Sequence, residues 1–382
     1  MSASQHRVAK ALFRASPMLF ALAAVLRLCL PLHAGAQSPA VEARKIQTAS
    51  EDAEALLRAA VQGNADAQYQ VGVAHHKGQG VPQNDEEAVH WFRLAADQGH
   101  APAQFLLGCA YRSGLGVVQD VAEAVRWYRR AADQEFAPAE NDLGVMYVTG
   151  RGVLQNAAEG VSWFRRAASQ GSSLAQFNLG VAYDTGDGVK RNVAEAVAWY
   201  RRAADQGDPM AQDNLGLKYV RGEGLRQNPS EAVQWFRRGA DQGYAAAQYN
   251  VGFAYKNGFG LARDGAAALR WFRLAANQGD ARAQANLGEG YANGQDGVLR
   301  DDASALLWFS LAIAGSERSA PYLKRLVTAR DSVAARMTTE QIAAEKHLEL
   351  EWRPTRRWEP DPAAEAKRFE LRWNRKEGGS PR

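Results

Sequence analysis

The chain of 382 residues is 46% hydrophobic and 23% charged, which is enough apolar sequence to bury a large core. Its formal net charge of +4 comes from the two ends, because residues 1–36 and 353–382 each carry +4 and leave the body, residues 37–352, at about −4. A basic surface for nucleic acid is therefore excluded from the body.

Residues 1–36 have the composition of a secretory signal peptide. Three basic residues lie in the first fourteen, an apolar stretch follows over residues 17–32, and residues 34–36 give an A-x-A cleavage site. The apolar stretch contains an arginine and a proline and is short for a membrane span, which argues against a retained anchor. We expect cleavage before Gln37, a mature protein in the periplasm or outside the cell, and no stable membrane span after cleavage.

The mature chain is expected to contain no internal disulfide. Of the two cysteines, Cys29 lies in the signal peptide and only Cys109 remains after cleavage. An oxidising compartment therefore cannot cross-link the fold, and packing must stabilise it. Residues 37–50 are predicted to form a flexible linker, and residues 51–64 to form an N-terminal capping helix.

A tryptophan recurs through the body of the chain at a nearly constant spacing, 36 residues five times and 37 once. The seven copies are Trp91, Trp127, Trp163, Trp199, Trp235, Trp271 and Trp308. A fixed period of this length is typical of a solenoid. The repeats cover residues 65–317, from 65–100 to 281–317.

Each repeat predicts two amphipathic helices. In the repeat at 173–208, apolar residues recur at helical spacing over 175–183 and again over 196–203. Gly186 and Gly188 break the chain between the two helices, because glycine accepts positive φ. Neither helix can bury its apolar stripe alone, so each pair is expected to stack on the next, with the recurring tryptophan at the interface.

One glycine recurs inside the first helix of every repeat, where it costs ~1 kcal/mol relative to alanine. Gly180 is the example in the repeat at 173–208. Its recurrence predicts that a neighbouring helix approaches the backbone closely at this position.

The chain after the repeats is expected to close the solenoid. Residues 318–352 predict two C-terminal capping helices, and the second opens with Thr338 followed by Gln341, a capping-box pattern. Residues 353–382 are predicted to be a basic flexible tail.

The repeats resemble the Sel-1-like repeat, a relative of the tetratricopeptide repeat. The resemblance rests on the A-x-A-Q opening, the NLG followed by a tyrosine, the G-x-G loop and the A-V-x-W-[YF]-R-R-A-A second helix, in seven copies over residues 65–317. It implies an all-α fold, a right-handed superhelical solenoid of antiparallel helix pairs with helical caps. It also implies a scaffold or adaptor that binds other proteins, with an envelope role in secreted bacterial members.

Two other functions stay open, a cell-wall-directed enzyme of the β-lactamase type and a structural module that binds peptidoglycan. The cysteine pairs of the family members to which penicillin binding is attributed are missing, and so is an S-x-x-K motif. The sequence also lacks H-E-x-x-H, a Gly-rich phosphate loop and G-x-S-x-G. The first repeat holds four histidines, but on different faces. We predict a non-enzymatic protein without catalytic residues, metal or cofactor.

The candidate binding surface follows from helical geometry. Positions 3, 7, 10 and 11 of each repeat are predicted to face the core, so positions 6 and 9 face the opposite way and line a concave groove. An extended peptide would bind there, to an asparagine row at position 6 and an apolar row at position 9. The predicted contact residues are Asn178, Asn214, Asn250, Asn286, Val181, Leu217 and Phe253. Alternatively, the asparagines bond to a neighbouring helix and serve the scaffold.

Expression of the full chain in a bacterial host tests the predicted signal peptide. The exported protein should begin at Gln37, because the A-x-A site ends at Ala36. N-terminal sequencing of the periplasmic fraction measures this directly. Recovery of the full-length chain in the membrane fraction would contradict it.

Overall fold

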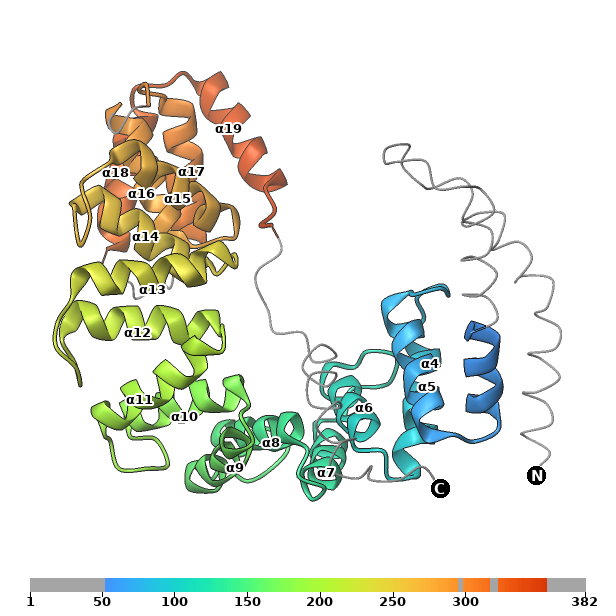
Figure 1. Cartoon of the computed structure of the whole chain (residues 1–382). Helices are drawn as coiled ribbons and strands as arrows, with labels where there is room; N and C mark the ends of the chain where they lie inside the picture. Colours follow the sequence, from blue (N-terminus) through green and yellow to red (C-terminus); the bar gives the residue numbers. More distant parts are fainter. Residues whose placement is uncertain (1–51, 295–297, 317–321, 356–382) are drawn as a thin grey trace, which may run out of the picture. The chain divides into compact units, whose positions relative to one another are not determined.

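The computed structural model describes residues 52–294, 298–316 and 322–355 (Figure 1). The predicted signal peptide and linker, and the tail beyond Thr355, lie outside these residues. The regular elements within the described ranges are helices, with no strand. The chain divides between Arg130 and Ala131 into two compact units, and each is described by itself.

The first unit begins with a helix over residues 52–61, within the predicted N-terminal cap. Two helix pairs follow. They are α4 (Ala65–Lys77) with α5 (Asp85–Asp97), and α6 (Ala101–Ser113) with α7 (Val121–Ala132), whose last two residues belong to the second unit.

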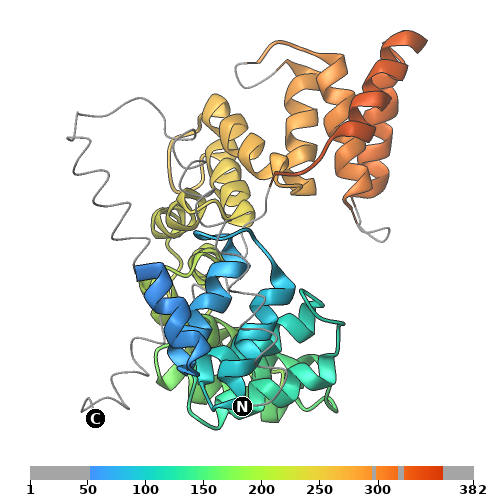
Figure 2. The same ribbon diagram turned by 90° about the vertical axis from the view of Figure 1, so that its right-hand side faces the viewer.

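The second unit holds five further pairs and the C-terminal helices, stacked in chain order (Figures 1 and 2). The pairs are α8 (Ala137–Thr149) with α9 (Ala157–Ser169), α10 (Ser173–Thr185) with α11 (Val193–Asp205), α12 (Pro209–Arg221) with α13 (Pro229–Asp241), α14 (Ala245–Asn257) with α15 (Gly265–Asn277), and α16 (Ala281–Asn293) with α17 (Asp302–Ala314). The last helices are α18 (Leu323–Ala334) and α19 (Thr339–Glu351). The predicted all-helical solenoid of seven repeats is confirmed.

The recurring glycine of each first helix lies against an aromatic ring of the second helix. A Cβ atom on Gly180 would lie 2.7 Å from a ring carbon of Tyr200, closer than two carbon atoms can pack. The predicted close approach is therefore confirmed. The seven pairs are Gly72 and Phe92, Gly108 and Tyr128, Gly144 and Phe164, Gly180 and Tyr200, Gly216 and Phe236, Gly252 and Phe272, and Gly288 and Phe309.

The recurring tryptophan packs between repeats, although not always fully buried. Trp235 is 4% exposed and joins a core cluster with Val197 and Tyr200 of α11, in the preceding repeat. Trp199, at the same position of the repeat, is half-buried. The guanidinium of Arg202 lies 4.2 Å from its ring centroid, so a neighbour on the same helix covers the indole.

The arginine two residues after most of these tryptophans reaches the next repeat. Arg165 donates to the hydroxyl of Tyr183 at 3.2 Å, and Arg201 donates to that of Tyr219 at 2.6 Å. These arginines therefore connect neighbouring repeats.

The C-terminal helices begin as the sequence predicts and then lead back to the repeats. The Thr338 hydroxyl accepts from the Gln341 amide, and the Gln341 side chain accepts from the Thr338 amide, which confirms the capping box. Beyond α19, the amide of Thr355 donates to the carbonyl of Asn277 at 2.7 Å. The first residues of the predicted tail therefore contact the end of α15.

Buried glutamines connect six of the seven first helices to the helix that precedes each of them. The glutamine at position 4 donates to a carbonyl eight residues earlier, at 3.0 to 3.4 Å. The pairs are Gln68 and Ala60, Gln104 and Ala96, Gln176 and Ala168, Gln212 and Ala204, Gln248 and Ala240, and Gln284 and Ala276. In several repeats a glutamine at the end of the second helix donates in turn to the position-4 oxygen, as Gln206 does to Gln176 at 2.7 Å. We call this set the glutamine ladder.

The third repeat replaces the ladder glutamine by Glu140, whose side chain is fully buried. A carboxylate cannot donate, and Arg166 instead donates to the Ala132 carbonyl at 3.3 Å. The Arg166 Nε lies 2.9 Å from the Glu140 Oε1, and the Gln170 side chain donates to the Oε2 at 2.6 Å. Burial outweighs these partners and raises the pKa of Glu140 from 4.5 to about 7.

Glu140 should make the stability of the second unit pH-dependent. Because its folded pKa lies above the unfolded value, its protonation stabilises the fold below pH 4.5, and this contribution is lost as pH rises through about 7. The glutamine of the Glu140→Gln variant cannot ionise. The difference in the free energy of unfolding between the variant and the wild type should therefore shift in favour of the variant by up to about 3 kcal/mol as the pH rises from 4.5 to about 7.

Chemical denaturation of the mature chain between pH 4.5 and 8 measures the effect. Asp241→Asn is the matched control, because it removes one exposed carboxylate of the same unit. If the free energies of unfolding of the wild type and Glu140→Gln change in parallel with pH, folding does not raise the pKa of Glu140 and the prediction is wrong.

Candidate functional site

The predicted binding residues lie on the first helices of four consecutive repeats in the second unit. Asn178 and Val181 belong to α10, Asn214 and Leu217 to α12, Asn250 and Phe253 to α14, and Asn286 to α16. A surface along these helices would extend over several repeats.

The asparagine row is hydrogen-bonded within the chain. The side-chain amide of Asn178 donates to Asn141 of α8 at 2.8 Å, and that of Asn250 donates to Asp213 of α12 at 2.7 Å. These two residues therefore connect neighbouring first helices, as the scaffold alternative expects. Peptide binding by the row stays a prediction.

The other two asparagines donate to their own helices. The acceptor is the carbonyl four residues earlier, Met210 for Asn214 at 3.0 Å and Arg282 for Asn286 at 2.8 Å. Their amide nitrogens therefore do not donate to another repeat.

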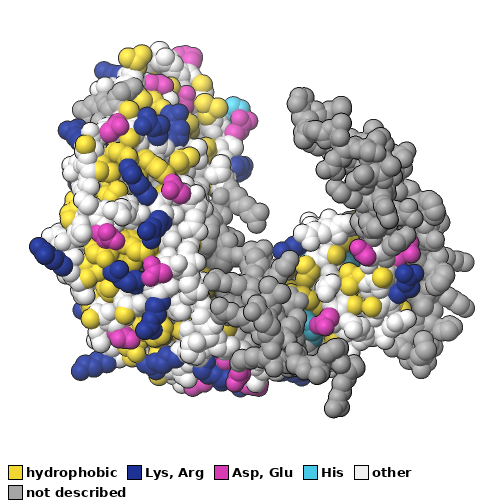
Figure 3. Space-filling model, viewed as in Figure 1, with side chains coloured by type: hydrophobic (Ala, Val, Ile, Leu, Met, Phe, Trp, Pro, Cys, Tyr) yellow, Lys and Arg dark blue, Asp and Glu magenta, His cyan; other side chains and the backbone are white. Residues whose placement is uncertain are grey.

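The apolar row becomes more exposed toward the C-terminal end. Val181 and Leu217 are half-buried, whereas the Phe253 side chain is 47% exposed. Figure 3 shows hydrophobic side chains exposed among lysines and arginines along the second unit. Phe253 is therefore the predicted site residue that is best placed to contact a ligand.

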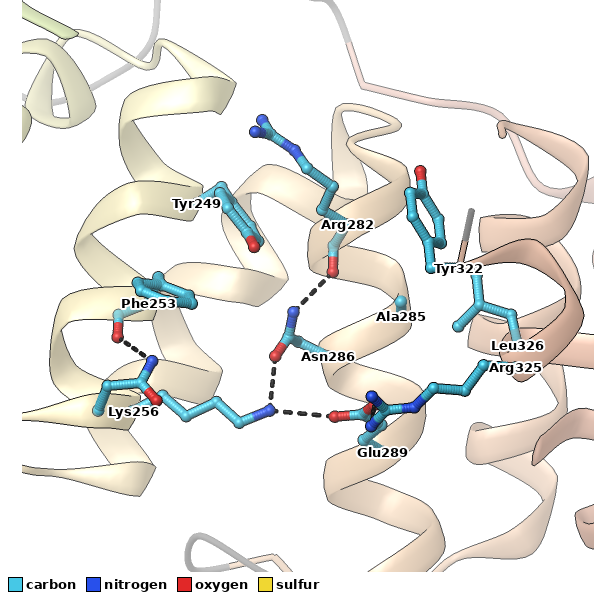
Figure 4. A pocket seen from close by; sticks show the side chains of 11 residues that line it. Tyr249, Phe253, Lys256, Arg282, Ala285, Asn286, Glu289, Tyr322, Arg325 and Leu326 are labelled. Atoms are coloured by element: carbon cyan, nitrogen blue, oxygen red, sulfur yellow. Dashed lines mark hydrogen bonds and ion pairs between the residues drawn. The ribbon is translucent and has the colours of Figure 1, made fainter. Parts of the chain in front are cut away.

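Phe253 lines a cavity of about 450 Å³ between α14, α16 and α18 (Figure 4). The cavity also contains Asn286 and thus brings together two of the predicted residues. Its full lining is Tyr249, Phe253, Lys256, Asn257, Arg282, Ala285, Asn286, Glu289, Tyr322, Arg325 and Leu326.

The cavity follows from a small residue in the seventh repeat. Position 5 is Tyr69, Phe105, Asn141, Phe177, Asp213 and Tyr249 in the first six repeats, and Ala285 in the seventh. Figure 4 places Ala285 between Tyr249 on one side and Tyr322 with Leu326 on the other. The missing side chain leaves space that these neighbours do not fill.

Charged side chains cluster at one end of the cavity. The Lys256 Nζ lies 2.6 Å from the Asn286 Oδ1 and 3.1 Å from a carboxylate oxygen of Glu289. Arg325 reaches the other oxygen of Glu289 at 3.1 Å (Figure 4). Two cations therefore share one carboxylate.

Arg282 lies at the opposite end of the cavity. Its guanidinium stacks 4.2 Å from the Tyr249 ring centroid and is paired with Asp280 at 2.7 Å. Burial lowers the pKa of Arg282, but the contacts with Asp280 outweigh it and raise the pKa above the usual value. Arg282 therefore stays charged.

Sequence reasoning did not single out most of this site. It missed Lys256, Arg282, Tyr322 and Arg325, because these positions vary between repeats or lie beyond the last one. The detectable signal was Ala285, the smallest residue at its position. An alignment of the repeats emphasises the residues that recur, so a single departure such as Ala285 is easily overlooked.

A second charged cluster lies in the core at a position predicted to be apolar. Lys218 is 4% exposed and lies 2.7 Å from a carboxylate oxygen of Asp184 and 2.8 Å from one of Glu223. Removing either partner would leave a buried charge with less compensation. This cluster connects two repeats.

The described part of the chain contains no group of His, Cys, Asp or Glu that could hold a metal ion. None of its helices combines the length and the apolar character needed to cross a membrane.

Comparison with protein families matches the Sel1 repeat seven times. The matched residues are 65–100, 101–136, 137–172, 173–208, 209–244, 245–280 and 281–316. These matches cover most of the chain. The comparison with curated proteins returned no match.

Two similar solved structures have the same repeat. A Sel1 repeat protein from Oxalobacter formigenes is 33% identical, with a TM-score of 0.58, over 66% of this chain and 98% of that one. The protein c5321 of uropathogenic Escherichia coli, a protective antigen with an SLR fold, is 30% identical, with a TM-score of 0.53, over 84% of this chain and 73% of that one.

Proposed function

Because the chain belongs to the Sel1 repeat family, we propose that it is a non-enzymatic scaffold that binds a protein partner in the periplasm or outside the cell. The partner contacts the first helices of the second unit. The observation that carries this proposal is the exposed Phe253 at the mouth of a cavity lined by three helices.

Repetition favours an extended peptide as the contacting part of the partner. Val181, Leu217 and Phe253 occupy the same position in three consecutive repeats. A peptide laid along these helices would place successive apolar side chains against them, which is a recurring mode of recognition by repeat surfaces.

The polar groups of the cavity favour binding over catalysis. The carboxylate that lines it, Glu289, is held between Lys256 and Arg325, and Asn286 accepts from Lys256. A general base must have a free oxygen within reach of a substrate proton. Both oxygens of Glu289 are held by cations, so this carboxylate is poorly placed for that role.

The proposed location rests on residues 1–36. Their basic start, apolar stretch and A-x-A site support export of the mature chain. A partner is therefore sought among exported or envelope proteins.

Affinity capture from a periplasmic extract, with the mature chain as bait, tests the proposed surface. Phe253→Ser should reduce capture of the principal partner about tenfold, because it removes an aromatic contact from the mouth of the cavity. Leu274→Ser is the matched control, since Leu274 is 48% exposed and lies on the second helix α15.

The two variants separate the outcomes. Loss of capture by Phe253→Ser alone, with an unchanged melting temperature, supports the first-helix surface. Capture by Phe253→Ser at the same level as by Leu274→Ser and the wild type would exclude that surface. Absence of any captured protein would contradict the scaffold function itself.

A further inference from the structure

We propose that the cavity between α14, α16 and α18 binds an acidic segment of the partner, in which a carboxylate lies at Lys256 and Arg325 and an adjacent large apolar side chain lies over Ala285. This inference rests on the proposed function and names the chemistry that the partner must have.

The end of the cavity that holds Lys256, Arg325 and Glu289 has two positive charges and one negative charge. Lys256 and Arg325 approach opposite oxygens of Glu289, and no other acidic side chain lines the cavity. The side chain of Arg325 is 80% exposed and that of Lys256 31% exposed, so a ligand can reach both cations. A second carboxylate between them would form a balanced set of two cations and two anions.

The remaining walls suit a large apolar side chain. Phe253 and Tyr322 are 47% and 40% exposed, and they flank the space above Ala285 together with Tyr249 and Leu326 (Figure 4). An aromatic or branched aliphatic side chain placed there would cover apolar surface that now contacts water. The volume of about 450 Å³ suits one such side chain and its neighbour.

The charge pattern also argues against the chain's own C-terminal segment as the occupant. Residues 353–382 contain nine basic and five acidic residues, and the cavity also has one cation in excess, because Lys256 and Arg325 share Glu289 while Arg282 is paired with Asp280. Two positively charged surfaces repel each other, so an acidic external segment is the better complement.

Selection from a random library of 12-residue displayed peptides tests the predicted chemistry. The bait is the mature chain, residues 37–382. Selected peptides should be enriched in Asp or Glu next to Phe, Trp, Tyr or Leu. Enrichment of basic or uncharged peptides, or no enrichment over the library, would overturn the proposal.

Variants then locate the binding of a synthetic copy of the most enriched peptide, by fluorescence anisotropy. Arg325→Gln should weaken it about tenfold, because one cation is lost. Glu289→Gln should strengthen it, because the competing carboxylate is removed and both cations become available to the peptide. Arg226→Gln, an exposed arginine in the α12–α13 loop, removes the same charge elsewhere and should change the affinity less than twofold.

The Glu289→Gln result excludes a purely structural role. If Glu289 only held α14 and α18 in place, its loss would weaken binding, and that outcome would overturn the assignment. Displacement of the peptide by isolated peptidoglycan sacculi, at the same site and with higher affinity, would assign the cavity to cell-wall material instead.

Failure of this inference can be told from failure of the proposed function. If a periplasmic partner is captured in a Phe253-dependent manner but no acidic peptide is selected, the surface stands and its chemistry is wrong. If neither assay yields binding, the scaffold function itself fails.

Discussion

The glycine inside each first helix determines how closely the two helices of a repeat approach, and the stacking of the repeats depends on that approach. The ring of Tyr200 occupies the space where a Cβ of Gly180 would lie, and the equivalent ring does so in every repeat. Because the two helices of a repeat are held in this position, the position-4 glutamine reaches a backbone carbonyl of the preceding second helix. Two short-range contacts are thus copied along the chain, and stability becomes a sum over neighbouring repeats.

The positions that build the scaffold carry similar residues in most repeats, so they do not distinguish one repeat from another. The cavity lining departs from this pattern. Ala285 departs from the larger residues at its position, Lys256 and Arg282 occupy variable positions, and Tyr322 and Arg325 come from α18, outside the repeats. At the C-terminal end of the second unit, residues that depart from the repeat pattern therefore line the cavity together with residues beyond the repeats.

The features that the sequence predicted are those that recur or act locally. The period, the helix pairs, the glycine contact and the capping box at Thr338 each depend on residues close in the chain or on an exact repeat. Single side chains were harder to predict. Trp199 is covered by Arg202 rather than fully buried, and Asn178 bonds to a helix of the preceding repeat, because both depend on which residue a neighbouring position carries. Glu140 and Lys218 break their patterns and required the packed structure to find their partners.

The claim that stability resides in contacts between neighbouring repeats is tested most directly by deleting one repeat. Removal of residues 173–208 joins Ser172 to Pro209, so Ser172 can cap α12 as it caps α10, and Gln212 can donate to Ala168. Helical content and the chemical denaturation midpoint of this variant are compared with those of a variant that lacks about 30 residues of the same repeat and so breaks the period. The account predicts a folded, shorter solenoid from the first deletion and loss of cooperative unfolding from the second. Equal unfolding by both deletions would contradict it.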